Sequence, residues 1–209
     1  MILYRPVGLE ELRLVYEAGL AAFPPRLPEQ PIFYPVLNPG YAAQIARDWN
    51  TKSPLAAGYV TQFELDDAFA QRYQVHQVGA RQHTELWVPA DELAEFNRHI
   101  RPPIRVTQAY FGDGFTGLVA ANFMLAGKDA VEQFVALDRI LAYSGFDFIC
   151  EVAANQVVVF LHYPFWVHRD FSAHGVPPER RDRVLSAITE RWKQGLADRP
   201  LPELPDPAA

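Results

Sequence analysis

The sequence predicts an α+β fold. Amphipathic helical patterns come early in the chain, strand-like runs follow, and too few strand–helix–strand crossovers occur for a doubly wound sheet. The 209 residues, with an apolar fraction of 49%, suffice for one large domain or two small ones with a buried core. The Gly-rich stretch GDGFTG (112–117) looks like a junction, so we divide the chain into residues 1–112 and 113–209.

The first segment alternates helices with a proline-rich loop. We expect a short strand at 2–5, then an amphipathic helix over 9–22 with apolar residues at helical spacing. Prolines exclude a helix or inner strand from FPPRLPEQP (23–31). IFYPVLN (32–38) is strand-like with a break at Pro35. Asn38 is then a good N-cap and Pro39 a good first helical residue.

The helix that begins after Asn38 should run to about Trp49 and bury Tyr41, Ile45 and Trp49. Strands are expected at 57–65, 73–80, 81–89 and 104–111, with a helix from about Asp91 to His99 between the last two.

The C-terminal part is expected to form a small α+β domain or an extension of the first core. A helix near 129–144 should precede two strands, FDFICEV (146–152) and VVVFLHY (157–163), which AANQ joins as a hairpin loop. A last helix should span about 178–194, and the Pro-rich tail DRPLPELPDPAA should be frayed.

The composition narrows the classes of function. A formal charge of −6 argues against a sequence-blind nucleic-acid binder, although it leaves a local basic patch possible. The single cysteine, Cys150, excludes an intramolecular disulfide and suits a reducing compartment. No apolar run approaches the roughly 20 residues of a membrane span. Because MILYRPVG has no signal-peptide pattern, we expect a cytoplasmic protein. The dispersed histidines give no metal-ligand spacing, so we expect no metal.

The stretch RQHTELWVP (81–89) places a carboxylate inside a strand-like run. Side chains alternate along a strand, so His83, Glu85 and Trp87 should share one face while Leu86 and Val88 enter the core. A carboxylate in a strand usually faces solvent. Glu85 is therefore either a solvent-facing residue of the sheet or a functional residue.

The order of these pieces resembles the ADP-ribosyltransferase-like fold. Such chains carry a strand with a phosphate-binding residue, then a Tyr-bearing strand that leads into a helix, and later a strand with a glutamate. The corresponding segments here are LYRPVG, IFYPVLNPGYAAQIARDW and RQHTELWVP. The chain also resembles a family of small bacterial proteins that carry the label ADP-ribosylation/crystallin J1. The segments that carry this resemblance are RLPEQPIFYPVLN, IARDWNTK and RQHTELWVPADEL. The resemblance covers about residues 1–112. It implies a mixed or antiparallel sheet with flanking helices. Crystallin J1-like hydrolases are all-helical with Asp-rich magnesium sites, so we discount glycohydrolase activity.

The resemblance implies an NAD-dependent transferase of ADP-ribose, with NAD as substrate and an acceptor that the sequence does not identify. Glu85 would contact the ribose, and His83 would orient the acceptor where many relatives carry Glu or Gln. The implied NAD-binding residues are Arg5 at the pyrophosphate, Tyr34 and then Tyr41 at the nicotinamide ring, and Tyr4 beside Arg5.

Each of these residues also has a structural interpretation. Arg5 can pair with a surface acid, and Tyr34 can be a core tyrosine. Arg26, in the proline-rich loop, is either a phosphate ligand or a solvated charge. The alternative function is a catalytically inactive member of the fold that acts as a binding or immunity-type interaction protein.

Overall fold

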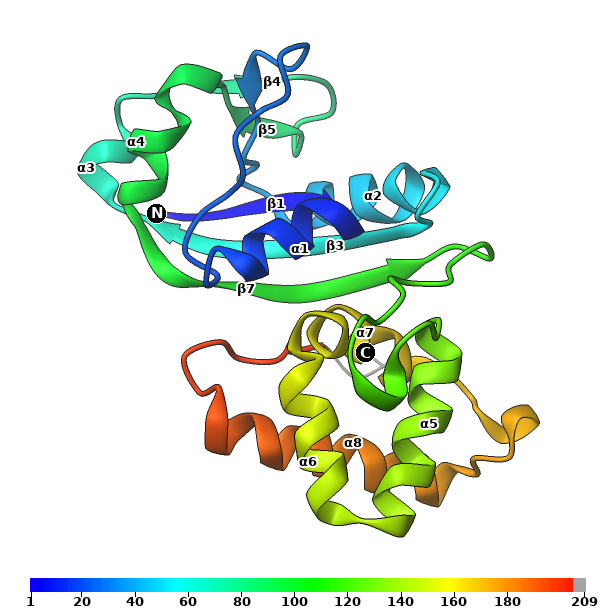
Figure 1. The fold of residues 1–209 in the computed structure, drawn as a ribbon. Helices are drawn as coiled ribbons and strands as arrows, with labels where there is room; N and C mark the ends of the chain where they lie inside the picture. Colours follow the sequence, from blue (N-terminus) through cyan, green and yellow to red (C-terminus); the bar gives the residue numbers. More distant parts are fainter. Residues whose placement is uncertain (205–209) are drawn as a thin grey trace. The chain divides into compact units, whose positions relative to one another are not determined.

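The computed structural model describes residues 1–204 and divides the chain into two compact units. The first contains Met1–Asp113 with a short segment that begins at Glu203, and the second contains Gly114–Pro202. Among the described residues, every strand belongs to the first unit, and the second unit is helical, so the fold is α+β. Figure 1 follows the elements along the chain.

An antiparallel sheet forms the centre of the first unit. Its order is β1 (Ile2–Gly8), β3 (Ala57–Leu65), β7 (Ile100–Phe111). The prediction for 57–65 is confirmed, and the strand predicted at 104–111 begins four residues earlier, at Ile100.

Val36 extends the pairing beyond the other edge of β1. The backbones of Tyr4 and Val36 exchange hydrogen bonds of 2.8 and 2.7 Å. On the far side, Leu86 N donates to Pro35 O at 2.9 Å, which brings in β5 (Thr84–Leu86) and its hairpin partner β4 (Val75–Gln77). A second small pair joins β2 (Ile32–Phe33) to β6 (Val88–Pro89). Segments remote in sequence therefore meet beside β1.

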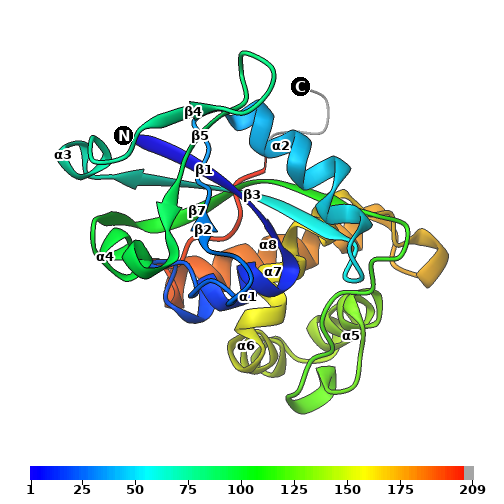
Figure 2. The ribbon, with the colours of Figure 1, turned by 90° about the horizontal axis from the view of Figure 1, so that it is seen from above.

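Helices cover this sheet. The helix α1 (Leu9–Glu17) buries its apolar stripe but is shorter than the predicted 9–22. It ends there because Gly19 and Leu20 adopt left-handed backbone angles, with φ of 73° and 57°. The helix α2 (Pro39–Asp48) packs against β1 and β3 (Figure 2), and the Asn38 side chain accepts from the backbone of Gly40 and Tyr41 as its N-cap.

One prediction for α2 is wrong. Trp49 was expected inside, but it is 63% exposed, whereas Tyr41 is buried and Ile45 is half-buried. The face that meets the sheet is made of the small residues Ala42, Ala43 and Ala46. These allow the helix to approach β3 closely, so the stripe of larger residues lies to one side.

An aromatic cluster fills the opposite part of the first unit's core. Phe96 from α4 (Leu93–Arg98) lies 5.4 Å from Phe33 and 6.1 Å from both Phe63 and Phe69, measured between ring centroids. The short helices α3 (Asp67–Ala70), η1 (Asn50–Lys52) and η2 (Ala90–Glu92) complete this unit.

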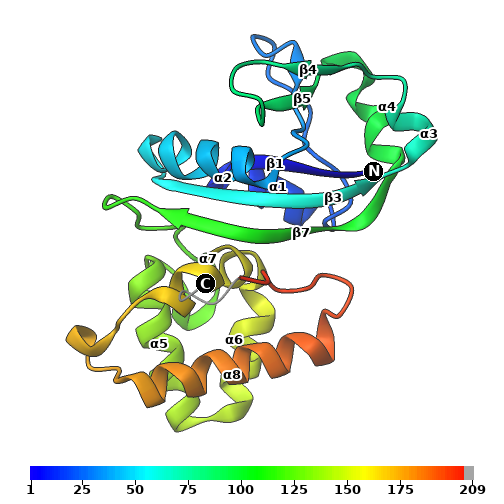
Figure 3. The same cartoon turned by 180° about the vertical axis from the view of Figure 1, so that it is seen from behind.

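The second unit is a group of four main helices (Figure 3), and both strands predicted there are wrong. The helices are α5 (Ala130–Tyr143), α6 (Gly145–Ala154), α7 (Gln156–His168) and α8 (Pro178–Gly195), with short turns η3 (Phe123–Leu125) and η4 (Ser172–His174). The predicted strand residues lie in α6 and α7, and of the predicted hairpin loop AANQ only Asn155 lies between these helices. A short apolar run has the same pattern in a buried helix as in a buried strand, and α7 buries residues all around its axis.

Within residues 1–204, no single helix is long and apolar enough to cross a membrane; α6 and α7, bent by 104°, reach that length and hydropathy only as a pair. Glu203, near the end of the described residues, belongs to the first unit, and its backbone N–H donates to the Val106 carbonyl at 3.1 Å. Residues 205–209 of the tail predicted to fray lie outside the described residues.

Candidate functional site

A cavity of about 610 Å³ opens in the first unit where the sheet edge meets α2 and the proline-rich loop. Cavities of this size hold ligands as large as cofactors. Four residues predicted from the sequence line it: Arg5, Tyr34, Tyr41 and Glu85. They come from β1, the segment after β2, α2 and β5, so the pairing through Val36 is what gathers them. The remaining lining residues are Pro6, Gly8, Glu11, Arg26, Gln30, Val36, Ile45, Trp49, Asn50 and Trp87.

Glu85 is a buried carboxylate in the middle of β5, with 8% of its surface exposed. Strand pairing with His76 on one side and Val36 on the other holds its backbone. The Trp87 indole donates to Oε1 of Glu85 at 2.7 Å. Within the described residues, no cation forms an ion pair with this carboxylate. Leu86 and Val88 are fully buried as predicted, which fixes the opposite side of the strand.

Trp87 supplies a flat surface beside that carboxylate. Its ring stacks on His76 at 4.2 Å between centroids and meets the Tyr34 ring edge-to-face at 6.2 Å. Both Trp87 and Tyr34 are partly exposed, at 44% and 37%. Aromatic rings that are fixed yet accessible suit a ligand with a planar ring.

The Arg5 guanidinium is held by the protein itself. Its Nε donates to Oε1 of Glu11 at 2.8 Å and its Nη2 to Oε2 at 3.3 Å, while Nη1 donates to the Tyr34 carbonyl at 3.2 Å. The guanidinium carbon also lies 4.6 Å from the Phe33 ring centroid. Arg5 is thus fixed in place, and Glu11 balances its charge.

Arg26 is the other cation of the wall, and it is less well partnered. Its Nη2 donates to Gln30 Oε1 at 2.6 Å, but its Nε is shielded and has no hydrogen-bond partner within the described residues. Burial lowers the pKa of Arg26, and the neighbouring charge of Arg5 lowers it further, although Glu11 and Tyr34 act in the opposite direction.

The other predicted site residues lie at or behind the wall. Burial raises the pKa of the Tyr41 hydroxyl, and the charge of Glu85 adds to this. His83 is not among the lining residues; its ring stacks on Tyr41 at 4.2 Å, and its Nε2 lies 3.2 Å from Gln44 Oε1. Tyr4 packs against the cluster of Val36 and the α2 alanines and is not among the lining residues.

The charges of the cavity are distributed unevenly. The charges of Arg5 and Glu11 shift the pKa of Arg26, whereas the charge of Glu85 shifts the pKa of Tyr41. One part of the wall therefore carries two guanidinium groups and the Glu11 carboxylate, and another carries the Glu85 carboxylate beside the Trp87 ring. A ligand complementary to this wall has an anionic group at one end and a planar, hydroxyl-bearing or cationic group at the other.

Most of the lining residues had not been predicted as part of the site, among them Glu11, Trp49 and Asn50. Glu11 lies in the first turn of the helix that follows the Arg5 strand, and this Arg–Glu spacing across a strand–helix junction was the available signal. Trp49 and Asn50 lie at the end of α2, where Trp49 had been assigned to the core.

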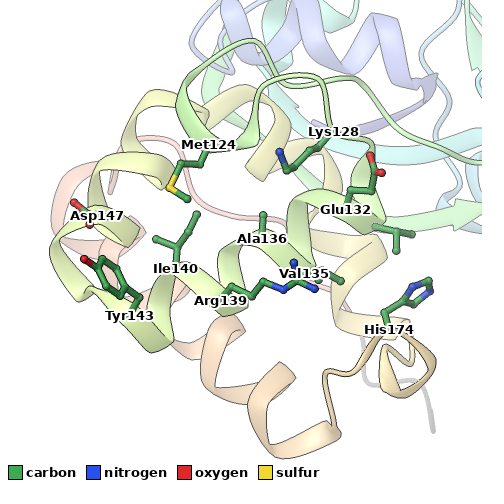
Figure 4. Close-up of a pocket in the computed structure, with 11 residues that line it drawn as sticks. Met124, Lys128, Glu132, Val135, Ala136, Arg139, Ile140, Tyr143, Asp147 and His174 are labelled. Atoms are coloured by element: carbon green, nitrogen blue, oxygen red, sulfur yellow. The ribbon is translucent and has the colours of Figure 1, made fainter.

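The second unit has a cavity of its own, of about 660 Å³ (Figure 4). Apolar side chains of α5 line it together with Met124, Lys128, Arg139 and His174. None of the predicted site residues belongs to it. Among residues 1–204, no group of three or more His, Cys, Asp or Glu side chains is arranged to hold a metal ion.

No protein-family model, curated protein or solved structure matches this chain.

Proposed function

We propose that the first unit binds NAD and transfers its ADP-ribose group to an acceptor, with Glu85 as the catalytic carboxylate. The observation that carries the proposal is that Glu85, Arg5 and Tyr34, from three separate segments, line one cavity. Arg5, Tyr34 and Glu85 follow one another in the order in which the ADP-ribosyltransferase-like fold carries its phosphate-binding residue, its aromatic residue and its glutamate. The uneven charge of the wall also suits NAD, which joins a pyrophosphate to a cationic nicotinamide ring.

The proposed reaction breaks the bond between the ribose C1′ and the nicotinamide nitrogen. The bonding electrons leave with nicotinamide, and positive charge develops on the ribose, as in glycoside hydrolysis. Glu85 stabilises this charge and accepts a hydrogen bond from a ribose hydroxyl. A nucleophile of the acceptor then bonds to C1′ and loses its proton. Glu85 suits this role because its carboxylate is nearly buried and forms no ion pair with a cation of residues 1–204.

The alternative is a binding protein of the same fold without catalysis. Two contacts favour it: Glu11 already occupies the Arg5 guanidinium, and His83 contacts Tyr41 and Gln44 instead of lining the cavity. In this case the cavity binds a nucleotide, and the acceptor-orienting position has no function. We propose a cytoplasmic location for either activity, which the single exposed cysteine supports.

NAD titration by calorimetry, combined with a nicotinamide-release assay, tests the proposal. The informative variant is Glu85→Gln, because the Gln amide oxygen can still accept from Trp87 while the charge is lost. We expect unchanged NAD affinity and a turnover lower by on the order of a hundredfold. Glu95→Gln, an exposed glutamate of α4 paired with Arg72, is the matched control. Equal turnover of Glu85→Gln and the parent would exclude Glu85 as the catalytic carboxylate. NAD binding without any nicotinamide release favours the alternative.

A further inference from the structure

Arg26 has hydrogen-bonding capacity that the protein leaves unused. Its guanidinium lines the cavity, yet Nη2 donates only to the neutral Gln30 side chain, and Nε has no acceptor within the described residues. No carboxylate of the described chain forms an ion pair with it. A partly buried guanidinium without a carboxylate partner keeps its charge unbalanced, and an anion that reaches its terminal nitrogens offers it the strongest hydrogen bonds.

Arg5 does not share this property. All three of its nitrogens donate within the protein, two of them to Glu11. An anion that bound Arg5 directly would have to compete with a carboxylate that is already in place. The two guanidinium groups lie close enough for Arg5 to lower the pKa of Arg26. An incoming anion therefore meets Arg26 as its available partner and Arg5 as a fixed neighbouring charge.

Hydrogen bonds at both ends hold the proline-rich loop that carries Arg26 in place. Phe23, at its start, is fixed by two hydrogen bonds with the Asn97 side chain, of 3.0 and 2.9 Å. Pro31, at its end, accepts from Ala90 N at 2.8 Å. Between them, Pro24, Pro25 and Pro28 restrict the backbone. A guanidinium on a restricted loop loses little freedom when it binds a ligand, which favours specific recognition.

We propose that Arg26 is the direct ligand of a phosphate or pyrophosphate group in this cavity, and that Arg5 acts as a positioning residue held by Glu11. This assigns the anion contact to a residue of the proline-rich loop instead of the β1 arginine. The inference rests on the proposed function in taking the anion to be the pyrophosphate of NAD. It does not require the transfer reaction, because ADP-ribose carries the same anion.

Calorimetric titration with NAD, ADP-ribose, inorganic pyrophosphate and nicotinamide tests this assignment. Arg26→Gln is expected to raise the dissociation constants of NAD and ADP-ribose by about tenfold to a hundredfold, as for loss of a charge-assisted hydrogen bond. Nicotinamide, which carries no phosphate, should be unaffected. Arg26→Lys keeps the charge without the planar fork, so its binding should be intermediate. Arg72→Gln, an exposed arginine outside the cavity, is the matched control. Thermal melts establish that each variant is folded.

The outcomes separate this inference from the proposed function. Parent-like affinity of Arg26→Gln for NAD and ADP-ribose would overturn the Arg26 assignment, even if the parent releases nicotinamide. Arg26-dependent binding of ADP-ribose by a parent that releases no nicotinamide would support the assignment and refute the transferase. Binding of pyrophosphate alone, equal in Arg26→Gln and the parent, would overturn the assignment. The absence of binding of every phosphate-bearing probe at millimolar concentrations would overturn both.

Discussion

The indole nitrogen of Trp87 donates a hydrogen bond to Oε1 of Glu85 across 2.7 Å; Glu85 lies in β5, and Trp87 is the extended residue between β5 and β6. Residues two apart in a strand lie on the same face, so this contact follows directly from the local backbone. The bond fixes one oxygen of the carboxylate and turns the group toward the cavity that both residues line. Trp87 is therefore placed to orient Glu85 as well as to present its own ring.

Removing this hydrogen bond should affect turnover more than binding. Trp87→Phe retains an aromatic ring that can stack on His76 but has no N–H. If Glu85 stabilises the transition state, loss of its orienting donor should lower kcat by about tenfold with little change in KM. Steady-state kinetics with NAD measures both constants. A rise in KM with unchanged kcat would instead indicate that Trp87 acts only in ligand binding.

Leu86 should contribute strongly to the stability of the first unit. Its side chain is fully buried, and Leu86→Ala is expected to lower the free energy of unfolding by about 2–5 kcal/mol. Its cross-strand partner Val75 is 45% exposed, so Val75→Ala is a matched control that should cost less than about 1 kcal/mol. Denaturant unfolding of the two variants gives the comparison. Equal losses would mean that the burial of Leu86 does not contribute to stability.

Local patterns predicted much of the first unit, although the strands expected over 73–80 and 81–89 are reduced to the short β4, β5 and β6. The alternation in RQHTELWVP predicted the burial of Leu86 and Val88, and the Asn-Pro pair at 38–39 predicted the start of α2. Such features depend on residues close in sequence. The gathering of Arg5, Tyr34 and Glu85 depends instead on the pairing of Val36 with two strands. No local pattern specifies that pairing, and the expectation of a shared site came from the family resemblance.

The predictions that were wrong also failed because of contacts between segments that are not described by local sequence patterns. The run at 157–163 lacks alternation, and the run at 146–152 alternates apart from Ile149, so the pattern within these short runs did not identify buried helices. Trp49 follows the helical stripe of Tyr41 and Ile45, but the alanine face of α2 packs on the sheet instead. The pairing of Arg5 with Glu11 forms across the junction where α1 directly follows β1, and the spacing of the two residues at this junction had not been interpreted as an ion pair.

The close packing of α2 on β3 should make Gly58 hard to replace. A Cβ at Gly58 would collide with the Ala46 carbonyl oxygen, so Gly58→Ala should lower the free energy of unfolding by about 1–3 kcal/mol. Its strand partner Gly8 is the control, since a Cβ there meets nothing nearer than the Ala57 carbonyl at 3.9 Å. Gly8→Ala should change stability by less than about 1 kcal/mol. Thermal melts compare them, and equal destabilisation would contradict the close approach.

A buried histidine organises the second unit. Nε2 of His162 accepts from Leu118 N at 2.9 Å, so its proton resides on Nδ1, which donates to Gln133 Oε1 at 2.8 Å. The Gln133 amide in turn donates to the carbonyls of Leu118 and Lys128. This network holds the segment before α5 against α7, and it requires a neutral imidazole.

Acid should therefore destabilise the second unit through His162. Burial lowers the pKa of this imidazole from 6.5 to about 3, so between these values the unfolded state binds a proton that the folded state does not. The resulting stability is complete above the unfolded pKa and declines as pH falls from 6.5 toward 3; the loss between about pH 7 and about pH 5 should be roughly 2 kcal/mol. Denaturant unfolding at these two pH values measures it. His162→Gln should lose this part of the pH dependence, whereas His174→Gln, at an exposed position of the same unit, should retain it. If the parent and His162→Gln lose the same stability between the two pH values, His162 does not titrate on unfolding.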